Sequence, residues 1–198
     1  VTEVAKGMGY DPRIGAEFLH AGLGYGGSCF PKDIESLIHT GQKFGYDFGL
    51  LKQVVDINHQ RVAHVLHHLE RELGSLSGRI IGVLGLSFKP NTDDLRQSKS
   101  VEVIETLLSA GAQVQAYDPV AVEKARLMLP EVKFCANAYE AAQDAHALLV
   151  LTEWREFKNL NLETIRSGMK LPLLIDGRNI YDPDQVRKLG FRYYSIGR

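Results

Sequence analysis

Cys29, Lys32 and Asp33 are the residues of this chain whose types and spacing best suit covalent chemistry. Cys29 lies at the predicted start of a helix, where unpaired backbone N–H groups and the helix dipole favour a thiolate, and Lys32 adds a positive charge one turn on. Asp33 follows Cys29 by four residues, so both side chains share one helix face and the carboxylate can accept a proton beside the sulfur. The alternative is a cysteine that only packs, as the apolar VKF before Cys135 suggests for that residue.

A glycine-rich segment lies directly before this cysteine. The run GLGYGG over Gly22–Gly27 formally matches the GxGxxG pattern of dinucleotide-binding loops. That pattern has meaning only between a strand and a helix of a βαβ unit, and the preceding FLHA is not a strand. We therefore reject a dinucleotide loop here and keep the physical content, which is that glycines let a backbone pass very close to another group. A flexible turn between two helices is the alternative.

Three further polar features each have two interpretations. Asp118 ends a predicted strand and either hydrogen-bonds a ribose or caps the helix predicted from Pro119, and the cap is favoured. The loop Phe88–Arg96 carries two basic residues and suits either phosphate or carboxylate recognition or a solvated crossover. His64 and His68 have the spacing of a metal pair, but no HExxH glutamate and no third ligand pattern accompany them. A solvated helix face is the favoured interpretation of these histidines.

The first 75 residues carry only helical signals, interrupted by the glycine-rich segment. Asp11 and Pro12 are typical of an N-cap and a first-turn proline, so a short helix carrying Arg13 is predicted to begin there. A second helix is predicted to begin around Ser28–Pro31. A third is predicted from near Asp47 until Gly74, with apolar residues in an i, i+3, i+4 rhythm at Leu50, Leu51, Val54, Val55, Val62, Val65, Leu66, Leu69 and Leu73. Its length of more than 20 residues indicates a connecting or interface element.

The GSLSG segment at Gly74–Gly78 is the predicted boundary between a helical region over 1–75 and a second domain over 76–198. Beyond it, apolar β-branched runs alternate with amphipathic helices, which predicts a buried parallel sheet with right-handed crossovers. The predicted fold class is α/β, with a helical dimerisation region followed by a doubly wound, Rossmann-like parallel-sheet domain. In such sheets ligands bind beyond the carboxyl ends of the strands, where the sequence places residues 87–96, 118, 152–154 and 176–179.

Composition excludes several classes of protein. Lys and Arg number 23 against 24 Asp and Glu, so nothing in the bulk charge favours nucleic acid or an anionic membrane. No apolar run approaches the roughly 20 residues of a membrane-spanning helix, and VTEVAKGMGYD at the start lacks the features of a signal peptide. Two cysteines in unlike contexts fit a reducing compartment, so a cytoplasmic location is expected. Because the chain does not begin with Met, we expect it to be a piece of a longer one.

Five segments, in order along the chain, resemble the nucleotide-sugar dehydrogenase family, and its UDP-glucose branch in particular: FLHAGLGYGGSCFPKD, GLSFKPNTDDLR, VQAYDP, LVLTEW and IDGRN. Ser28 and Phe30 follow that branch, since GDP-mannose relatives resemble GSCLPKD and UDP-N-acetylmannosamine relatives resemble GHCIPVD. The resemblance implies an N-terminal NAD-binding domain, a helical middle built around a long dimerisation helix, and a Rossmann-like domain that holds the UDP-sugar. This chain resembles the last two parts, and the NAD-binding domain is absent from it.

The resemblance also implies roles for individual residues. Cys29 is implied to add to the aldehyde formed at the terminal carbon of the sugar, giving a thiohemiacetal and then a thioester, and Asp33 is implied to activate the water that hydrolyses it. A lysine and an asparagine that the family uses have no match here. The implied substrate contacts are Arg13 (reaching the neighbouring subunit), His20, Ala21, Gly22, Leu23, Gly24, Tyr25, Gly26, Phe88, Lys89 and Arg178. The residues implied to lie near NAD are Cys29, Lys32 and Arg96, and no metal is implied.

Two functional hypotheses follow. In the first, the chain is part of an NAD-dependent UDP-glucose 6-dehydrogenase that binds UDP-glucose and forms a homodimer through the long helix. In the second, the isolated chain is a non-catalytic module for nucleotide-sugar binding and dimerisation, or it belongs to a dehydrogenase for another nucleotide sugar such as GDP-mannose or UDP-N-acetylmannosamine. Neither hypothesis involves nucleic acid or a membrane.

Overall fold

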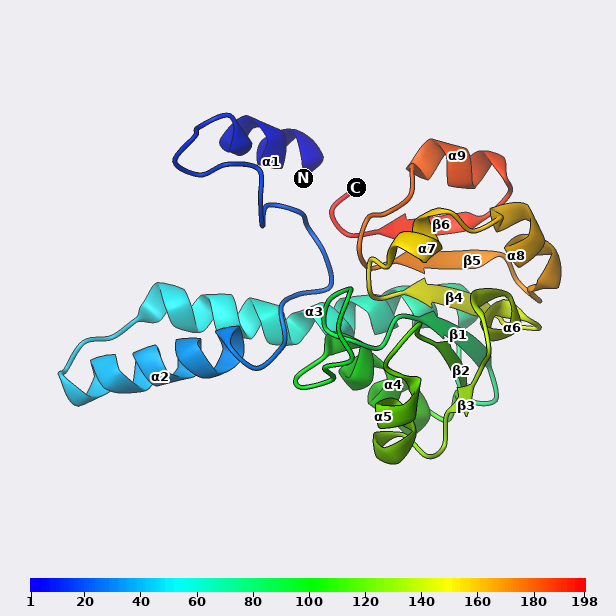
Figure 1. Ribbon diagram of the computed structural model, residues 1–198, viewed down its shortest axis with the longest axis horizontal. Helices are drawn as coiled ribbons and strands as arrows, with labels where there is room; N and C mark the ends of the chain where they lie inside the picture. The colour runs from blue at the N-terminus through cyan, green and yellow to red at the C-terminus, as the bar shows by residue number, and fades with distance from the viewer.

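The computed structural model describes residues 1–198 and has an α/β architecture of nine helices and six strands. A sheet domain forms one side of the molecule, a hairpin of two helices projects from it, and a short N-terminal helix stands apart (Figure 1). The two chain ends lie close together, and the amino group of Val1 donates to the carbonyl of Gly197 at 3.1 Å. The predicted fold class is confirmed.

The helices and strands alternate after the first three helices. The helices are α1 (Thr2–Gly9), α2 (Phe30–Lys43), α3 (Gly49–Leu73), α4 (Lys99–Ser109), α5 (Val122–Met128), α6 (Ala138–Ala142), α7 (Arg155–Lys158), α8 (Leu162–Gly168) and α9 (Pro183–Lys188). The strands are β1 (Ile80–Leu84), β2 (Gln113–Tyr117), β3 (Lys133–Phe134), β4 (Ala147–Val150), β5 (Leu173–Asp176) and β6 (Arg192–Ser195). None of the helices is both long enough and apolar enough to cross a membrane.

The six strands form one parallel sheet in the order β3-β2-β1-β4-β5-β6. In its centre, Val83 of β1 lies opposite Ala116 of β2 and Leu149 of β4. The chain runs outward from β1 in both directions, so the carboxyl ends of β1 and β4 flank the switch point at which doubly wound sheets bind ligands.

Apolar side chains fill both faces of this sheet. One cluster joins one sheet face to α3, α4 and α5, and the other joins the opposite face to α6, α7, α8 and α9. Val62, Val65 and Leu69 of α3 belong to the first cluster. The C-terminal half of the long helix therefore packs on the sheet, while its N-terminal half extends away with α2 (Figure 1).

The predictions of α2 and α3 are confirmed, but the helix predicted from Asp11 is wrong. The first helix ends at Gly9, and the Asp11 carbonyl closes a single turn by accepting from the N–H groups of Ile14 and Gly15. The Asp11 carboxylate accepts from the Arg13 N–H, as an N-cap would. Gly15, with φ of 71°, then ends the turn before a second one forms.

Candidate functional site

The glycine-rich segment passes in close contact with the sheet domain. A Cβ atom on Gly26 would lie 2.1 Å from the carbonyl oxygen of Gln97, and one on Gly27 would lie 2.7 Å from the ring of Phe88. Only glycine fits at such a separation. The predicted close approach of this backbone is confirmed, and the groups it approaches belong to the protein itself.

Three elements hold the segment in place. The Gly27 N–H donates to the carbonyl of Arg96 at 3.0 Å, and the Arg178 guanidinium reaches the carbonyl of Gly24 at 3.4 Å. The side chain of Asn58 on α3 makes two bonds to the backbone of Tyr25. Leu23 is fully buried in the first apolar cluster. The segment is thus fixed at the edge of the sheet where β1, β4 and β5 end.

Cys29 is a free, exposed thiol at the N-cap of α2, as predicted. No side chain caps this helix, and the hydroxyl of Ser28 lies 3.8 Å from the sulfur. The Asp33 N–H donates to the Cys29 carbonyl at 2.9 Å, so one helical turn separates the two residues. Lys32 Nζ lies 3.7 Å from the Asp33 carboxylate, and both side chains are mostly exposed. The uncapped helix start leaves N–H groups beside a thiol that solvent reaches.

Arg178 follows β5, and its largely buried side chain connects three segments of the chain. Its side chain is 16% exposed and lies 3.3 Å from the Glu153 carboxylate. The guanidinium donates to the carbonyls of Leu151, Gly24 and Phe88, which belong to three separate segments. Burial lowers the pKa of Arg178, and the charge of Glu153 opposes that shift. This cation therefore joins the glycine-rich segment to the loops after β1 and β4.

The loop after β1 carries the other predicted basic residues. Lys89 is exposed and places its Nζ 5.4 Å from the centre of the Phe88 ring. Arg96 makes a two-pronged contact with Asp94, at 2.9 Å and 2.7 Å, and these bonds lower the pKa of Asp94 to about 2. The same bonds raise the pKa of Arg96, and the charge of Cys29 adds to that rise. The loop is thus ordered, with its cations at the surface.

Asp118 at the end of β2 has its oxygens bonded to protein groups. One oxygen accepts from the backbone of Val120 and Ala121, which begins the turn into α5. The other accepts from the backbone of Leu86, at 2.8 Å, and from the Trp154 ring nitrogen, at 3.1 Å. The favoured capping interpretation is confirmed, and because Asp118 is 2% exposed, no ribose can reach it.

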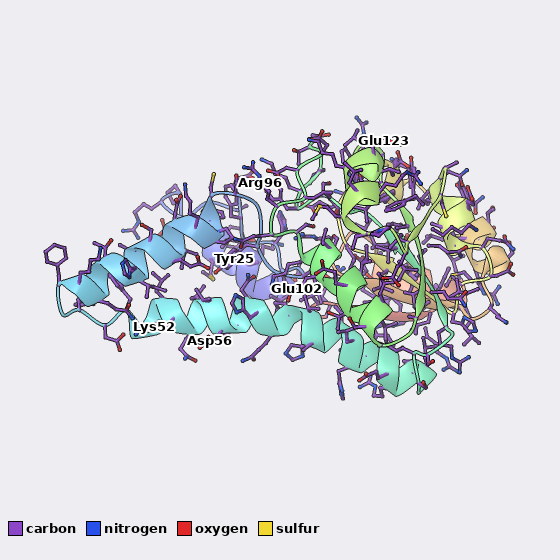
Figure 2. All side chains as sticks on the ribbon, turned by 90° about the horizontal axis from the view of Figure 1, so that it is seen from below. Tyr25, Lys52, Asp56, Arg96, Glu102 and Glu123 are labelled. Carbon is purple, nitrogen blue, oxygen red and sulfur yellow. The ribbon has the colours of Figure 1, made fainter.

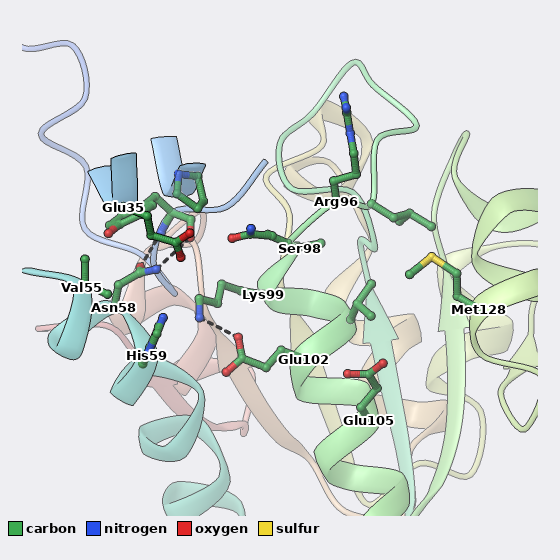
Figure 3. Close-up of a pocket in the computed structure, with 15 residues that line it drawn as sticks. Glu35, Val55, Asn58, His59, Arg96, Ser98, Lys99, Glu102, Glu105 and Met128 are labelled. Carbon is green, nitrogen blue, oxygen red and sulfur yellow. Dashed lines mark hydrogen bonds and ion pairs between the residues drawn. The ribbon is translucent and has the colours of Figure 1, made fainter. Parts of the chain in front are cut away.

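Two cavities adjoin these segments. The first, of about 560 Å³, lies between the hairpin and the sheet domain and is lined by Tyr25, Asn58, Arg96, Lys99 and Glu102, among others (Figure 3). From below the molecule, Tyr25 and Arg96 are seen near this junction, whereas Lys52 and Asp56 lie farther out on the hairpin (Figure 2).

The second cavity, of about 580 Å³, lies beside the carboxyl ends of β4 and β5 and includes three predicted substrate residues, His20, Ala21 and Arg178. Its other basic lining residues are Lys6, Lys158 and Arg198. The other predicted residues line neither cavity, namely Arg13, Gly22, Leu23, Gly24, Gly26, Cys29, Lys32, Asp33, Phe88 and Lys89. Arg13 is the most isolated, because its side chain is 88% exposed and hydrogen-bonds only to Asp11.

Sequence patterns did not identify Asn58, and they placed Glu153 at a strand end without assigning it a partner. Asn58 is 8% exposed and sits on the apolar face of α3 between Val55 and Val62. A polar residue in an apolar stripe is a readable signal, because burial requires it to find a hydrogen-bond partner. Glu153 carried no comparable signal, since its partner Arg178 lies on another strand end.

Two histidines of α3, His64 and His68, line neither cavity. His64 is exposed, as predicted, but the solvated interpretation is wrong for His68, which is half-buried with its ring 5.0 Å from that of Tyr194. Contact with β6 in the folded chain explains the difference. No group of three or more His, Cys, Asp or Glu side chains is arranged to hold a metal ion.

Comparison with known proteins places these features in one family. Residues 1–60 match the central domain of the UDP-glucose/GDP-mannose dehydrogenase family, and residues 82–183 match its UDP binding domain.

All of this chain aligns with 46% of a UDP-glucose 6-dehydrogenase of Rhizobium meliloti (strain 1021), at 47% identity, and with 43% of UDP-glucose 6-dehydrogenase TuaD of Bacillus subtilis (strain 168), at 43% identity. The structure of a UDP-glucose dehydrogenase from the archaeon Pyrobaculum islandicum matches 97% of this chain and 42% of its own, with a TM-score of 0.86 and 36% identity. The chain thus spans less than half the length of these relatives. By its fold, its cysteine-bearing segment and these matches, it belongs to the UDP-glucose/GDP-mannose dehydrogenase family.

Proposed function

We propose that this chain is the substrate-binding and nucleophile-bearing part of an NAD-dependent UDP-glucose 6-dehydrogenase, which oxidises UDP-glucose to UDP-glucuronate. The observation that carries the proposal is the free, exposed Cys29 thiol on a segment fixed at the ligand-binding edge of a doubly wound sheet. The names of the curated relatives support the same substrate.

Cys29 is the proposed nucleophile. Its sulfur bonds to the aldehyde carbon of the half-oxidised sugar, and the carbonyl oxygen takes up a proton to give a thiohemiacetal. After the second oxidation, the carbon is held as a thioester. Water then attacks the thioester carbonyl, the C–S bond breaks and Cys29 leaves as a thiolate. Asp33, one turn along α2, accepts the proton of that water.

NAD is the cofactor that the family implies, and when bound it supplies the acceptor for the hydride that leaves the sugar carbon. The sheet of this chain has the strand order of dinucleotide-binding folds, but Asp118, at the ribose-binding position, is buried against protein. Lys32 and Arg96 are exposed cations near Cys29 that fit the edge of a dinucleotide site. We therefore place the main NAD pocket in a part of the parent protein outside these residues.

The nucleotide sugar is proposed to bind to the 76–198 domain, with the 1–75 region supplying the thiol. The second cavity carries several positive charges beside Arg178, which suits a diphosphate. Lys89 is the proposed exposed contact from the loop after β1. Arg178 is proposed to contribute by fixing three segments as well as by its charge.

A second copy of the chain is proposed to pack on the hairpin. In α3, Leu50, Val54 and Ile57 are 84%, 40% and 53% exposed, an apolar face that pairing across a two-fold axis would bury. Arg13 is then free to reach the partner copy, since its side chain is almost wholly exposed. Sedimentation at tens of micromolar tests this directly, and a stable monomer there would count against the dimer.

The test of the proposed function uses the full-length parent protein. Wild type is expected to produce NADH with UDP-glucose, followed at about 340 nm, and Cys29→Ala is expected to lower kcat by about 10³-fold or more. Cys135→Ala is the matched control and should retain activity. The 198-residue chain alone is expected to be inactive but to bind UDP-glucose in calorimetry. Equal turnover of GDP-mannose or UDP-N-acetylmannosamine would overturn the choice of sugar.

A further inference from the structure

The Asn58 side chain replaces a missing backbone partner for the glycine-rich segment. Its Oδ1 accepts from the Tyr25 N–H at 2.8 Å, and its Nδ2 donates to the Tyr25 carbonyl at 3.1 Å. One primary amide thus satisfies both polar groups of one residue, the pattern that a neighbouring strand would supply. Asn58 is 8% exposed, and these two hydrogen bonds satisfy the polar atoms that its burial removes from water.

The backbone beside the contact is shaped to admit this amide. A Cβ atom on Gly24 would lie 2.4 Å from Asn58 Oδ1, and Gly24 has φ of 118°, a conformation that other residues rarely adopt. The glycine and the asparagine are therefore matched across 33 to 34 positions of sequence. A larger side chain at either position would move the two backbones apart.

The contact is linked to the reactive cysteine through aromatic packing. The ring of Tyr25 packs edge-on against that of Phe30, with centres 6.3 Å apart and planes at 77°. Phe30 is the first residue of α2 and adjoins Cys29. Holding Tyr25 therefore holds the start of the helix on which the thiol sits.

Asn58 is also the support that comes from the helical region. The carbonyl of Gly24 is held by Arg178, and the N–H of Gly27 is held by the carbonyl of Arg96, both in the sheet domain. Asn58 supplies the corresponding hydrogen bonds from α3, so the segment is tied both to the sheet domain and to the helical region. Losing Asn58 leaves the segment tied to the sheet but free to move relative to α3.

We propose that Asn58 is a positioning residue that fixes the Tyr25 backbone and, through Phe30, the place of Cys29 at the start of α2. Its relevance to turnover rests on the proposed function of Cys29, whereas its effect on the segment does not. The role belongs to the amide group as a paired donor and acceptor, so a side chain of similar size without that pairing cannot replace it.

Three variants separate this role from general stability. Asn58→Leu keeps similar bulk and removes both bonds. Asn58→Asp keeps the acceptor for the Tyr25 N–H, but donates to the Tyr25 carbonyl only when its carboxyl is protonated. Val65→Ala is the matched control, because Val65 is buried on the same helix at 1% exposure and packs in the core.

The first readout is hydrogen exchange of peptides spanning residues 22–30, corrected for intrinsic rates. Asn58→Leu should speed exchange there by about tenfold, because both hydrogen bonds to the Tyr25 backbone are lost. Asn58→Asp should give an exchange rate between those of wild type and Asn58→Leu at about pH 8, because it keeps the acceptor for the Tyr25 N–H, and it should regain protection as the pH falls and its carboxyl becomes protonated. Val65→Ala should lower the melting temperature and leave local exchange as in wild type. Unchanged exchange in Asn58→Leu, or equal acceleration in Val65→Ala, would overturn the proposal.

The second readout is turnover by the parent protein. Asn58→Leu should lower kcat by about tenfold, while Val65→Ala keeps the wild-type kcat at a temperature where both are folded. A wild-type kcat in Asn58→Leu would refute the link to Cys29. An inactive wild-type parent would instead refute the proposed function, and hydrogen exchange would still decide whether Asn58 fixes the segment.

Discussion

The two halves of α3 place similar apolar side chains in different surroundings. From Val62 onward the helix buries Val65, Leu69 and Leu73 against the sheet, whereas Leu50 in its first turn is 84% exposed. The hairpin partner does not change this, because α2 buries only Pro31 and Gly41. The amphipathic pattern thus predicts which side chains favour burial along the whole helix. Only the C-terminal half of α3 is buried by another part of the same chain, which is the sheet.

The same substitution in the two halves gives the largest expected contrast. Leu69→Ala removes a fully buried side chain and should cost about 2–5 kcal/mol of unfolding free energy. Leu50→Ala should change the unfolding free energy of the monomer by no more than about 0.5 kcal/mol. Urea unfolding of dilute samples measures both. A cost at Leu50 comparable with that at Leu69 would show that the first half is already buried, by self-association, under those conditions.

The two cysteines extend the comparison to reactivity. Cys29 is exposed at a helix start, while Cys135 is 5% exposed, and burial raises the pKa of the Cys135 thiol with a smaller contribution from Glu140. Iodoacetamide should therefore label Cys29 about 10²-fold faster than Cys135. Timed labelling followed by peptide mass spectrometry gives both rates in one sample. Equal rates would contradict the assignment of Cys29 as the reactive thiol.

Substitution of two cations of the proposed substrate site should have different effects on UDP affinity and on the stability of the fold. Lys89 is exposed, so Lys89→Ala should weaken UDP binding by about tenfold with little change in melting temperature. Arg178→Ala should weaken binding and also destabilise the fold, because three backbone carbonyls lose a donor. Calorimetry with UDP and with GDP, beside thermal unfolding, measures both effects. A Lys89→Ala variant with wild-type affinity would exclude that residue from the site.

The smallest expected effect comes from the ion pair between Arg96 and Asp94, at the surface of the loop after β1. Hydrogen bonds from Arg96 hold the pKa of Asp94 at about 2, below its ordinary value of 3.8. Because the folded-state pKa is the lower one, the pair stabilises the fold above about pH 3.8, and this contribution is lost as the pH falls towards 2. Nuclear magnetic resonance titration should show the low midpoint, and Arg96→Ala should return it towards 3.8. An unmoved midpoint in that variant would assign the shift to another group.

Local sequence patterns determined much of this protein. The alternation of apolar runs and amphipathic helices predicted the parallel, doubly wound sheet, and the same kind of local pattern predicted the long helix and the cysteine at a helix start. These features follow from periodicity and capping, which act between residues a few positions apart. The sequence analysis gave no bounds for the short helices of the sheet domain, although Asn161 and Asp182 carry the capping signals that begin α8 and α9.

Only the tertiary structure decided what surrounds the cysteine segment. Asn58 meets Tyr25 across 33 positions, and Arg178 reaches Gly24 across 154. No local pattern encodes such pairs, because a side chain shows its type in the sequence but acquires its partner only when distant segments pack together. The same reason explains the glycines of this segment, because in the folded chain the Gln97 carbonyl and the Phe88 ring leave no room for a side chain at Gly26 and Gly27.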